Sequence, residues 1–165
     1  MDSEVKLHLS RAEDEFLLAN QDLKISTDAK TKETLGIVKE KTFYYSVISH
    51  AYYSIFHTAK AYLLSKDIKI ELPNEHQKTY NEFKKLVNSG RLNKQLLNIY
   101  ETETTKAEAL LDILFLEKKK RGLFTYNVKS EANLPYARES IENARKFISA
   151  IKLILENSSY NSNSR

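Results

Sequence analysis

The chain has 165 residues, of which 41% are hydrophobic, and this is enough for the core of one domain. It contains no Cys, which excludes disulfides and thiolate metal sites, and no run of the ~20 apolar residues that a transmembrane helix needs. We therefore expect a cytoplasmic protein with no membrane contact. The formal charge of +4 permits an anionic partner but also suits a solvated, lysine-rich surface.

Only three Gly and two Pro interrupt the chain, and this composition favours long helices over short strands. The first predicted helix covers about residues 2–25. Its apolar residues alternate in steps of four and three along one face: Val5, Leu9, Ala12, Phe16, Ala19 and Leu23. Residues 26–34 are polar and predict a loop or a frayed helix start.

The stretch 44–64, YYSVISHAYYSIFHTAKAYLL, predicts the central helix of a bundle, with a start anywhere between residues 32 and 42. One stripe along it should face a core: Tyr45, Ile48, Tyr52, Ile55, Ala59 and Leu63. Further apolar residues fill much of the remaining surface. We therefore expect other helices to wrap around this one.

Pro73 lies in an aperiodic loop, after which Asn74 is expected to cap a short helix that ends near Val87. A long helix should follow over about 92–120, with a kink or an exposed bulge at the polar stretch ETETTK. The last helix should begin near residue 133 or 135 and close the bundle. We thus predict an all-α, antiparallel up-and-down bundle of four or five helices, one domain over 1–157 and a disordered tail over 158–165.

No metal site or nucleotide-binding glycine loop is evident in the sequence. His50 and His57 share a helix face, but seven residues separate them by ~10 Å along the axis, which is too far for one zinc ion. The three glycines are isolated, and no nucleophile elbow occurs. We expect neither a metal nor another cofactor.

A basic run is the strongest chemical signal in the chain: Lys118, Lys119, Lys120 and Arg121, followed by Gly122. Arg suits phosphate because its planar fork donates two hydrogen bonds at once. Cations at a helix C-terminus also complement the helix dipole, which is an equally simple structural explanation. Tyr126 lies five residues beyond the Arg, but a phenol is a poor general base at neutral pH, and an imidazole is better.

Three segments together resemble the prokaryotic HEPN domain: AYYSIFHTAKAYLL at 51–64, NEHQKTYNEF at 74–83 and LEKKKRGLFTY at 116–126. The resemblance implies a dimerising helical bundle, often paired with a minimal nucleotidyltransferase in toxin–antitoxin systems. Many HEPN domains are metal-independent ribonucleases with an Arg followed by a His. Arg121 matches the Arg, but Tyr126 stands at the His position, so a general base for cleavage would have to come from elsewhere. His57 and His76 match two other family histidines.

Two functional hypotheses follow. In the first, a homodimer binds RNA or a nucleotide phosphate as a candidate ribonuclease toxin: Arg121 holds the phosphate, Tyr126 orients it and the lysines attract the strand. His57 or His76 would be the general base, and Tyr53 and His76 are further candidates for contact with the RNA. In the second, the chain is a non-catalytic interaction module that acts with a nucleotidyltransferase partner. A bundle with no ligand is the simplest alternative.

The distribution of apolar residues gives a separate reason to expect dimerisation. Around 110–116 the apolar side chains are too broadly distributed for a helix with a single buried stripe. A second apolar face of this kind commonly meets another subunit. We therefore expect the chain to pair with a second copy of itself.

Overall fold

The computed structural model describes residues 2–119 and 133–162, with side chains over 2–110 and 133–158. All the regular secondary structure in this part of the chain is helical, and the helices form a bundle, which confirms the predicted all-α class. Its helices are α1 (Ser3–Thr27), α2 (Ala29–Thr34), α3 (Tyr44–Leu64), α4 (Glu75–Asn88), α5 (Lys94–Lys119) and α7 (Leu134–Ser162). None of the helices described is long and apolar enough to cross a bilayer.

The helix ends follow local chemistry. The Asp2 carboxylate accepts a hydrogen bond from the Glu4 amide at 3.2 Å and caps α1, and Asp28 accepts one from the Thr31 amide at 2.7 Å and caps α2. After α4, the chain turns through Gly90 at a φ of +77°, a conformation that suits glycine. Asn74 precedes α4 as predicted, but its side chain makes no capping hydrogen bond.

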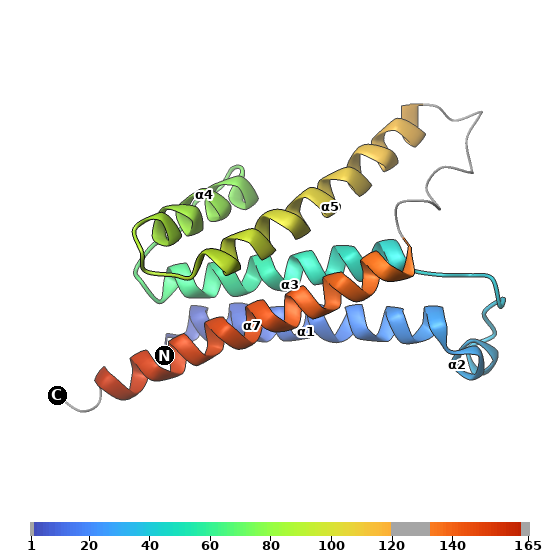
Figure 1. Cartoon of the computed structure of the whole chain (residues 1–165), viewed down its shortest axis with the longest axis horizontal. Coiled ribbons are helices and arrows are strands. Elements are labelled where there is room, and N and C mark those ends of the chain that lie inside the picture. The colour runs from blue at the N-terminus through green and yellow to red at the C-terminus, as the bar shows by residue number, and fades with distance from the viewer. Residues whose placement is uncertain (1, 120–132, 163–165) are drawn as a thin grey trace.

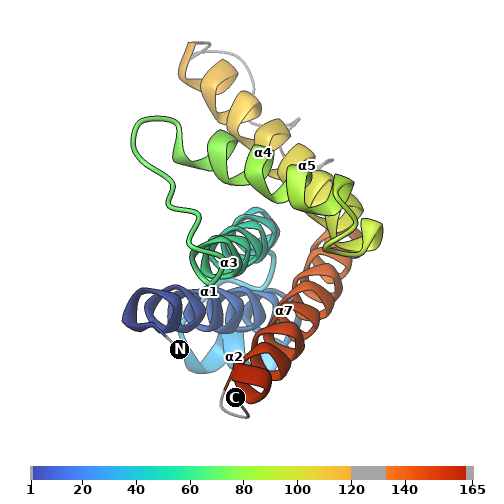
Figure 2. The same ribbon diagram turned by 90° about the vertical axis from the view of Figure 1, so that its left-hand side faces the viewer.

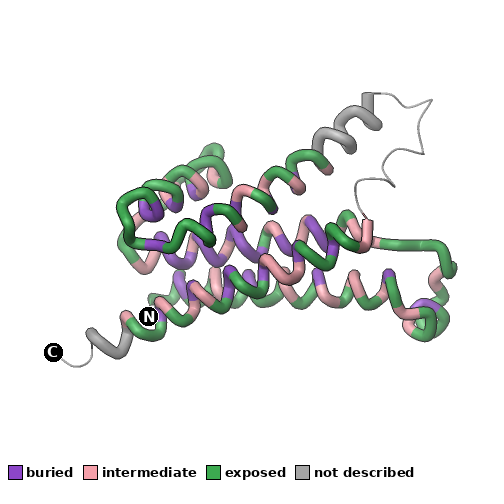
Figure 3. Tube along the Cα trace, in the orientation of Figure 1, coloured by how far each residue is buried: buried purple, intermediate pink, exposed green. Residues whose placement is uncertain are grey.

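Helix α3 lies at the centre of the bundle and packs against α1, α7, α5 and α4, most extensively against α1 (Figures 1 and 2). It runs antiparallel to α1, and α5 crosses it at an angle (Figure 1). Buried positions recur along its whole length (Figure 3). The prediction of a wrapped central helix is confirmed, except that Tyr45 of the expected core stripe is 47% exposed.

Three aromatic rings, one each from α4, α5 and α7, form a buried cluster. The rings of Phe83, Tyr100 and Phe147 are fully buried, and their centroids lie 5.4 to 5.9 Å apart. Two of the three contacts are edge-on, a geometry that adds to the gain from burial alone. This cluster fixes α4 and α5 on the bundle.

Three local expectations need correction. The segment expected to be a loop or a frayed helix start contains the short helix α2. α5 passes unbroken through the ETETTK stretch, where we expected a kink or an exposed bulge. α7 continues to Ser162, so the disordered tail predicted over 158–165 cannot begin at residue 158.

Candidate functional site

Three of the predicted site residues come together in the structure. Tyr53 and His57 lie on α3, and His76 lies in the first turn of α4. The Phe56 ring contacts both imidazoles, with its centroid 4.0 Å from that of His76 and 5.1 Å from that of His57. The Tyr53 ring meets His76 edge-on at 5.6 Å. The junction of α3 and α4 is therefore an aromatic site.

The basic part of the predicted site falls largely outside the described residues. Lys118 and Lys119 are the last residues of α5, and only their backbone is described. Three predicted site residues lie wholly outside the described part: Lys120, Arg121 and Tyr126.

A third imidazole, which the sequence interpretation did not single out, completes what we call the histidine cluster: His8, His57 and His76. The Nδ1 atoms of His8 and His57 lie 3.1 Å apart, and their rings stack with centroids 5.3 Å apart. Two neutral imidazoles can share this hydrogen bond only if one carries its proton on Nδ1 and the other on Nε2. His76 Nδ1 is hydrogen-bonded to the Tyr52 hydroxyl at 2.9 Å.

The environment of the cluster disfavours protonation of its rings. Desolvation, with Lys60 and Arg11 nearby, lowers the pKa of His8 to about 4. Desolvation, reinforced by His8 and Arg11, lowers the pKa of His57 to about 4. The His76 pKa is also lowered, first by desolvation of a ring that lies on Phe56 and then by Lys60. All three imidazoles are therefore neutral at pH 7.

These contacts limit the catalysis that the histidines can perform. A general base works best when its pKa lies near the operating pH, and a group with a pKa of about 4 accepts a proton only weakly at neutral pH. His50, the fourth histidine of the chain, is held elsewhere, with its Nδ1 2.6 Å from the Glu15 carboxylate. Each imidazole in the protein thus already has an internal partner.

A cavity of about 710 Å³ opens between α3, α4 and α5, directly beside the histidine cluster. Tyr52 lines it from α3, His76 and Tyr80 line it from α4, and Glu101 and Glu108 line it from α5. The Tyr80 hydroxyl donates to the Glu101 carboxylate at 2.6 Å. Its volume lies within the range of small-molecule sites. We call it the α3–α4–α5 cavity.

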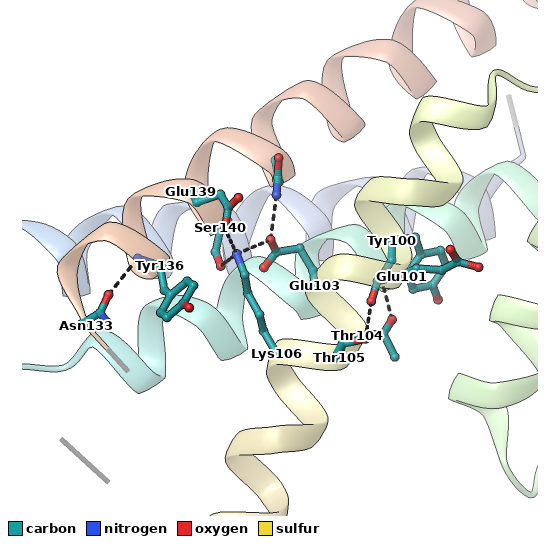
Figure 4. Close-up of polar contacts among 11 residues, drawn as sticks. Tyr100, Glu101, Glu103, Thr104, Thr105, Lys106, Asn133, Tyr136, Glu139 and Ser140 are labelled. Atoms are coloured by element: carbon teal, nitrogen blue, oxygen red, sulfur yellow. Dashed lines mark hydrogen bonds and ion pairs between the residues drawn. The ribbon is translucent and has the colours of Figure 1, made fainter. Parts of the chain in front are cut away.

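A second feature, a buried polar network, links Glu103 and Lys106 of α5 to side chains of α7 (Figure 4). The Glu103 side chain is fully buried, and its Oε1 accepts from Lys106 Nζ at 3.0 Å and from Asn143 Nδ2 at 2.8 Å. Lys106 Nζ also donates to Glu139 Oε2 at 2.5 Å and to Ser140 Oγ at 3.3 Å. Glu103 Oε2 has no partner within the part of the chain that is described.

Sequence reasoning missed Glu103, although a signal for it was present. It continues the buried face of α5, at steps of three or four residues from Tyr100 and Ala107, so a carboxylate stands on an apolar stripe. His8 was harder to predict as a site residue, because its partner His57 lies 49 residues away in the sequence. Over 2–110 and 133–158, where side chains are described, no group of three or more His, Cys, Asp or Glu side chains could hold a metal ion.

Comparisons of the chain with protein-family models, with curated proteins and with solved structures found no match. The HEPN assignment therefore stays a prediction that rests on the three sequence segments that carry the resemblance.

Proposed function

We propose that the protein is a HEPN-like helical module that binds RNA or a nucleotide phosphate through the basic run 118–121 and Tyr126. The observation that carries this proposal is the distribution of charge. Residues 117–132 contain five cationic and two carboxylate side chains, and so hold three of the four net positive charges of the chain. Concentrated positive charge is what attracts a phosphate backbone.

The charge of the α3–α4–α5 cavity argues against a phosphate site there. The α3–α4–α5 cavity has three glutamates in its lining and neither Lys nor Arg. A phosphate would be repelled there. In the proposed site Arg121 binds the phosphate with its two-pronged guanidinium, Tyr126 orients it, and the lysines raise the local potential without selecting a sequence.

The positions of the histidines favour binding without cleavage over ribonuclease activity. Attack by a ribose 2′-hydroxyl needs a general base, and the family position for that base holds Tyr126 here. His57 Nδ1 faces His8, and the pKa of His57 is lowered to about 4 by desolvation. The ribonuclease toxin is therefore the second candidate function, and the non-catalytic module is the first.

Assembly is part of the proposal. In it the chain forms a homodimer that brings two basic runs together, and a protein of nucleotidyltransferase fold is the expected partner. Light scattering of the purified chain should give twice the mass of 19.1 kDa. A monomer at micromolar concentration would contradict this part of the proposal.

The decisive experiment compares Arg121→Ala with a matched control, Arg145→Ala. Arg145 is an exposed arginine that pairs with Glu142 one turn away on α7. Fluorescence anisotropy with labelled single-stranded RNA should show at least about tenfold weaker binding for Arg121→Ala, the value expected for the loss of one charge-assisted contact, and a change within about twofold for the control. Unchanged affinity in Arg121→Ala would remove the basic run as the site.

The same samples separate the two candidate functions. Labelled RNA incubated with the protein in EDTA should remain intact if the module is non-catalytic. Cleavage that persists in EDTA and disappears in Arg121→Ala would instead establish the metal-independent ribonuclease.

A further inference from the structure

The α3–α4–α5 cavity has the wrong charge for the phosphate site and points to a different ligand. The charged side chains that line it are three glutamates, Glu75, Glu101 and Glu108, and the other lining residues are neutral. Lys60 pairs with Glu75, and Lys84 lies 3.6 Å from Glu101, so these two carboxylates are already balanced from outside the cavity. Glu108 has no ion pair or hydrogen bond to any residue that the structure describes. Among the residues whose side chains are described, one carboxylate of the lining therefore remains without a counter-charge.

The neutral groups of the lining present hydrogen-bond acceptors and ring faces. Thr104 and Thr105 donate their hydroxyl protons to the carbonyls of Tyr100 and Glu101, which leaves the hydroxyl lone pairs available. One ammonium already lies over the Tyr80 ring, since Lys84 Nζ is 5.5 Å from its centroid. Ring faces of this kind attract cations.

Tyr52 lines the α3 side of the cavity, and its hydroxyl is hydrogen-bonded to His76 Nδ1 at 2.9 Å. Desolvation, then the neighbouring Tyr53 and Glu108, raises the pKa of Tyr52 to about 12. Glu108 on α5 therefore acts electrostatically on a hydroxyl that belongs to α3. A cation bound in the cavity would be attracted by this carboxylate.

We propose that the α3–α4–α5 cavity binds a small organic amine in its ammonium form, with Glu108 as the counter-charge and the Tyr52 and Tyr80 rings beside its alkyl body. An ammonium group offers three donors to a lining of carboxylate and hydroxyl acceptors. The cavity volume of about 710 Å³ accommodates a diamine as well as a monoamine. This site is independent of the basic run and of any RNA that binds there.

The test titrates the full chain with putrescine by isothermal titration calorimetry at pH 7.5 and low salt. The wild type should bind saturably at one site, with a dissociation constant below about 1 mM. Glu108→Gln should weaken binding at least about fivefold, and Glu108→Lys should abolish it by placing a cation in the lining. Because Glu108 is exposed, neither change should alter the helical circular dichroism spectrum.

The matched control is Glu33→Gln, which removes an exposed carboxylate of α2 outside the cavity and should leave putrescine affinity unchanged. Three results would overturn the proposal: no saturable binding to the wild type up to about 10 mM, equal affinity in Glu108→Gln, or competition between AMP and putrescine. RNA affinity in Glu108→Gln should equal that of the wild type, so a failure here is distinguishable from failure of the phosphate site.

Discussion

Removal of Lys106 should be one of the most damaging single charge changes in the bundle. Its side chain is 15% exposed and provides the only cationic partner that the described residues give to the fully buried Glu103 carboxylate. Lys106→Met keeps most of the apolar stem but leaves that carboxylate with Asn143 alone. Breaking a buried pair by removing one partner costs about 3 to 5 kcal/mol.

The loss of folding free energy should be measured by urea and thermal unfolding, both followed by circular dichroism at the helix minimum. For a chain of this length, 3 to 5 kcal/mol corresponds to a decrease in Tm of roughly 6 to 20 °C. The matched control is Lys152→Met, because Lys152 pairs with Glu13 at an exposed position, where such pairs contribute about 0 to 1 kcal/mol.

A double variant separates the charge effect from packing. Replacement of both partners, as in Glu103→Leu with Lys106→Met, removes the unpaired charge and should recover most of the stability lost in Lys106→Met. A single-variant cost within about 1 kcal/mol of the Lys152→Met control would refute the argument, because Glu103 would then need no cation at this position.

Three further outcomes test the fold. His57→Gln should flatten the pH dependence of the free energy of unfolding. Desolvation lowers the pKa values of His8 and His57 to about 4 in the folded protein, so the unfolded state takes up protons first and the wild type loses stability as pH falls from about 6.5 to 4. Equal pH profiles for the two proteins would contradict this. Phe83→Ala should cost about 3 to 5 kcal/mol in urea unfolding, whereas the exposed Leu35→Ala should cost under about 0.5. Asp28→Ala should lower the urea midpoint of unfolding through the lost cap of α2, and an unchanged midpoint would argue against that cap.

Local patterns were sufficient for most of the helices. The first helix was predicted over about 2–25 and spans Ser3–Thr27, because the alternation of apolar residues at steps of three and four is a property of neighbouring residues alone. The central position of α3 could also be predicted, since a helix that is apolar on most sides needs neighbours on most sides. The one failure of that stripe, Tyr45, lies in the first turn of α3.

The ETETTK stretch shows where local patterns stop being informative. From the sequence it is a polar, β-branched segment that suggests a kink or an exposed bulge, yet α5 runs through it and buries Glu103. That burial depends on Asn143 and Ser140 of α7, which are about 40 residues away and satisfy the carboxylate and its lysine. A polar residue on a helix can thus be solvated or buried according to what a distant helix offers it.

The sequence by itself determined that the chain is helical, where its long helices lie and that its positive charge is concentrated near residue 120, because each of these follows from composition and from spacing along the chain. Only the tertiary structure decided that His8 pairs with His57, that every histidine has an internal partner, and that the α3–α4–α5 cavity is acidic. The physical reason is that desolvation and charge pairing depend on which side chains meet in space. Helical periodicity fixes the face on which a residue lies but not the residue that faces it.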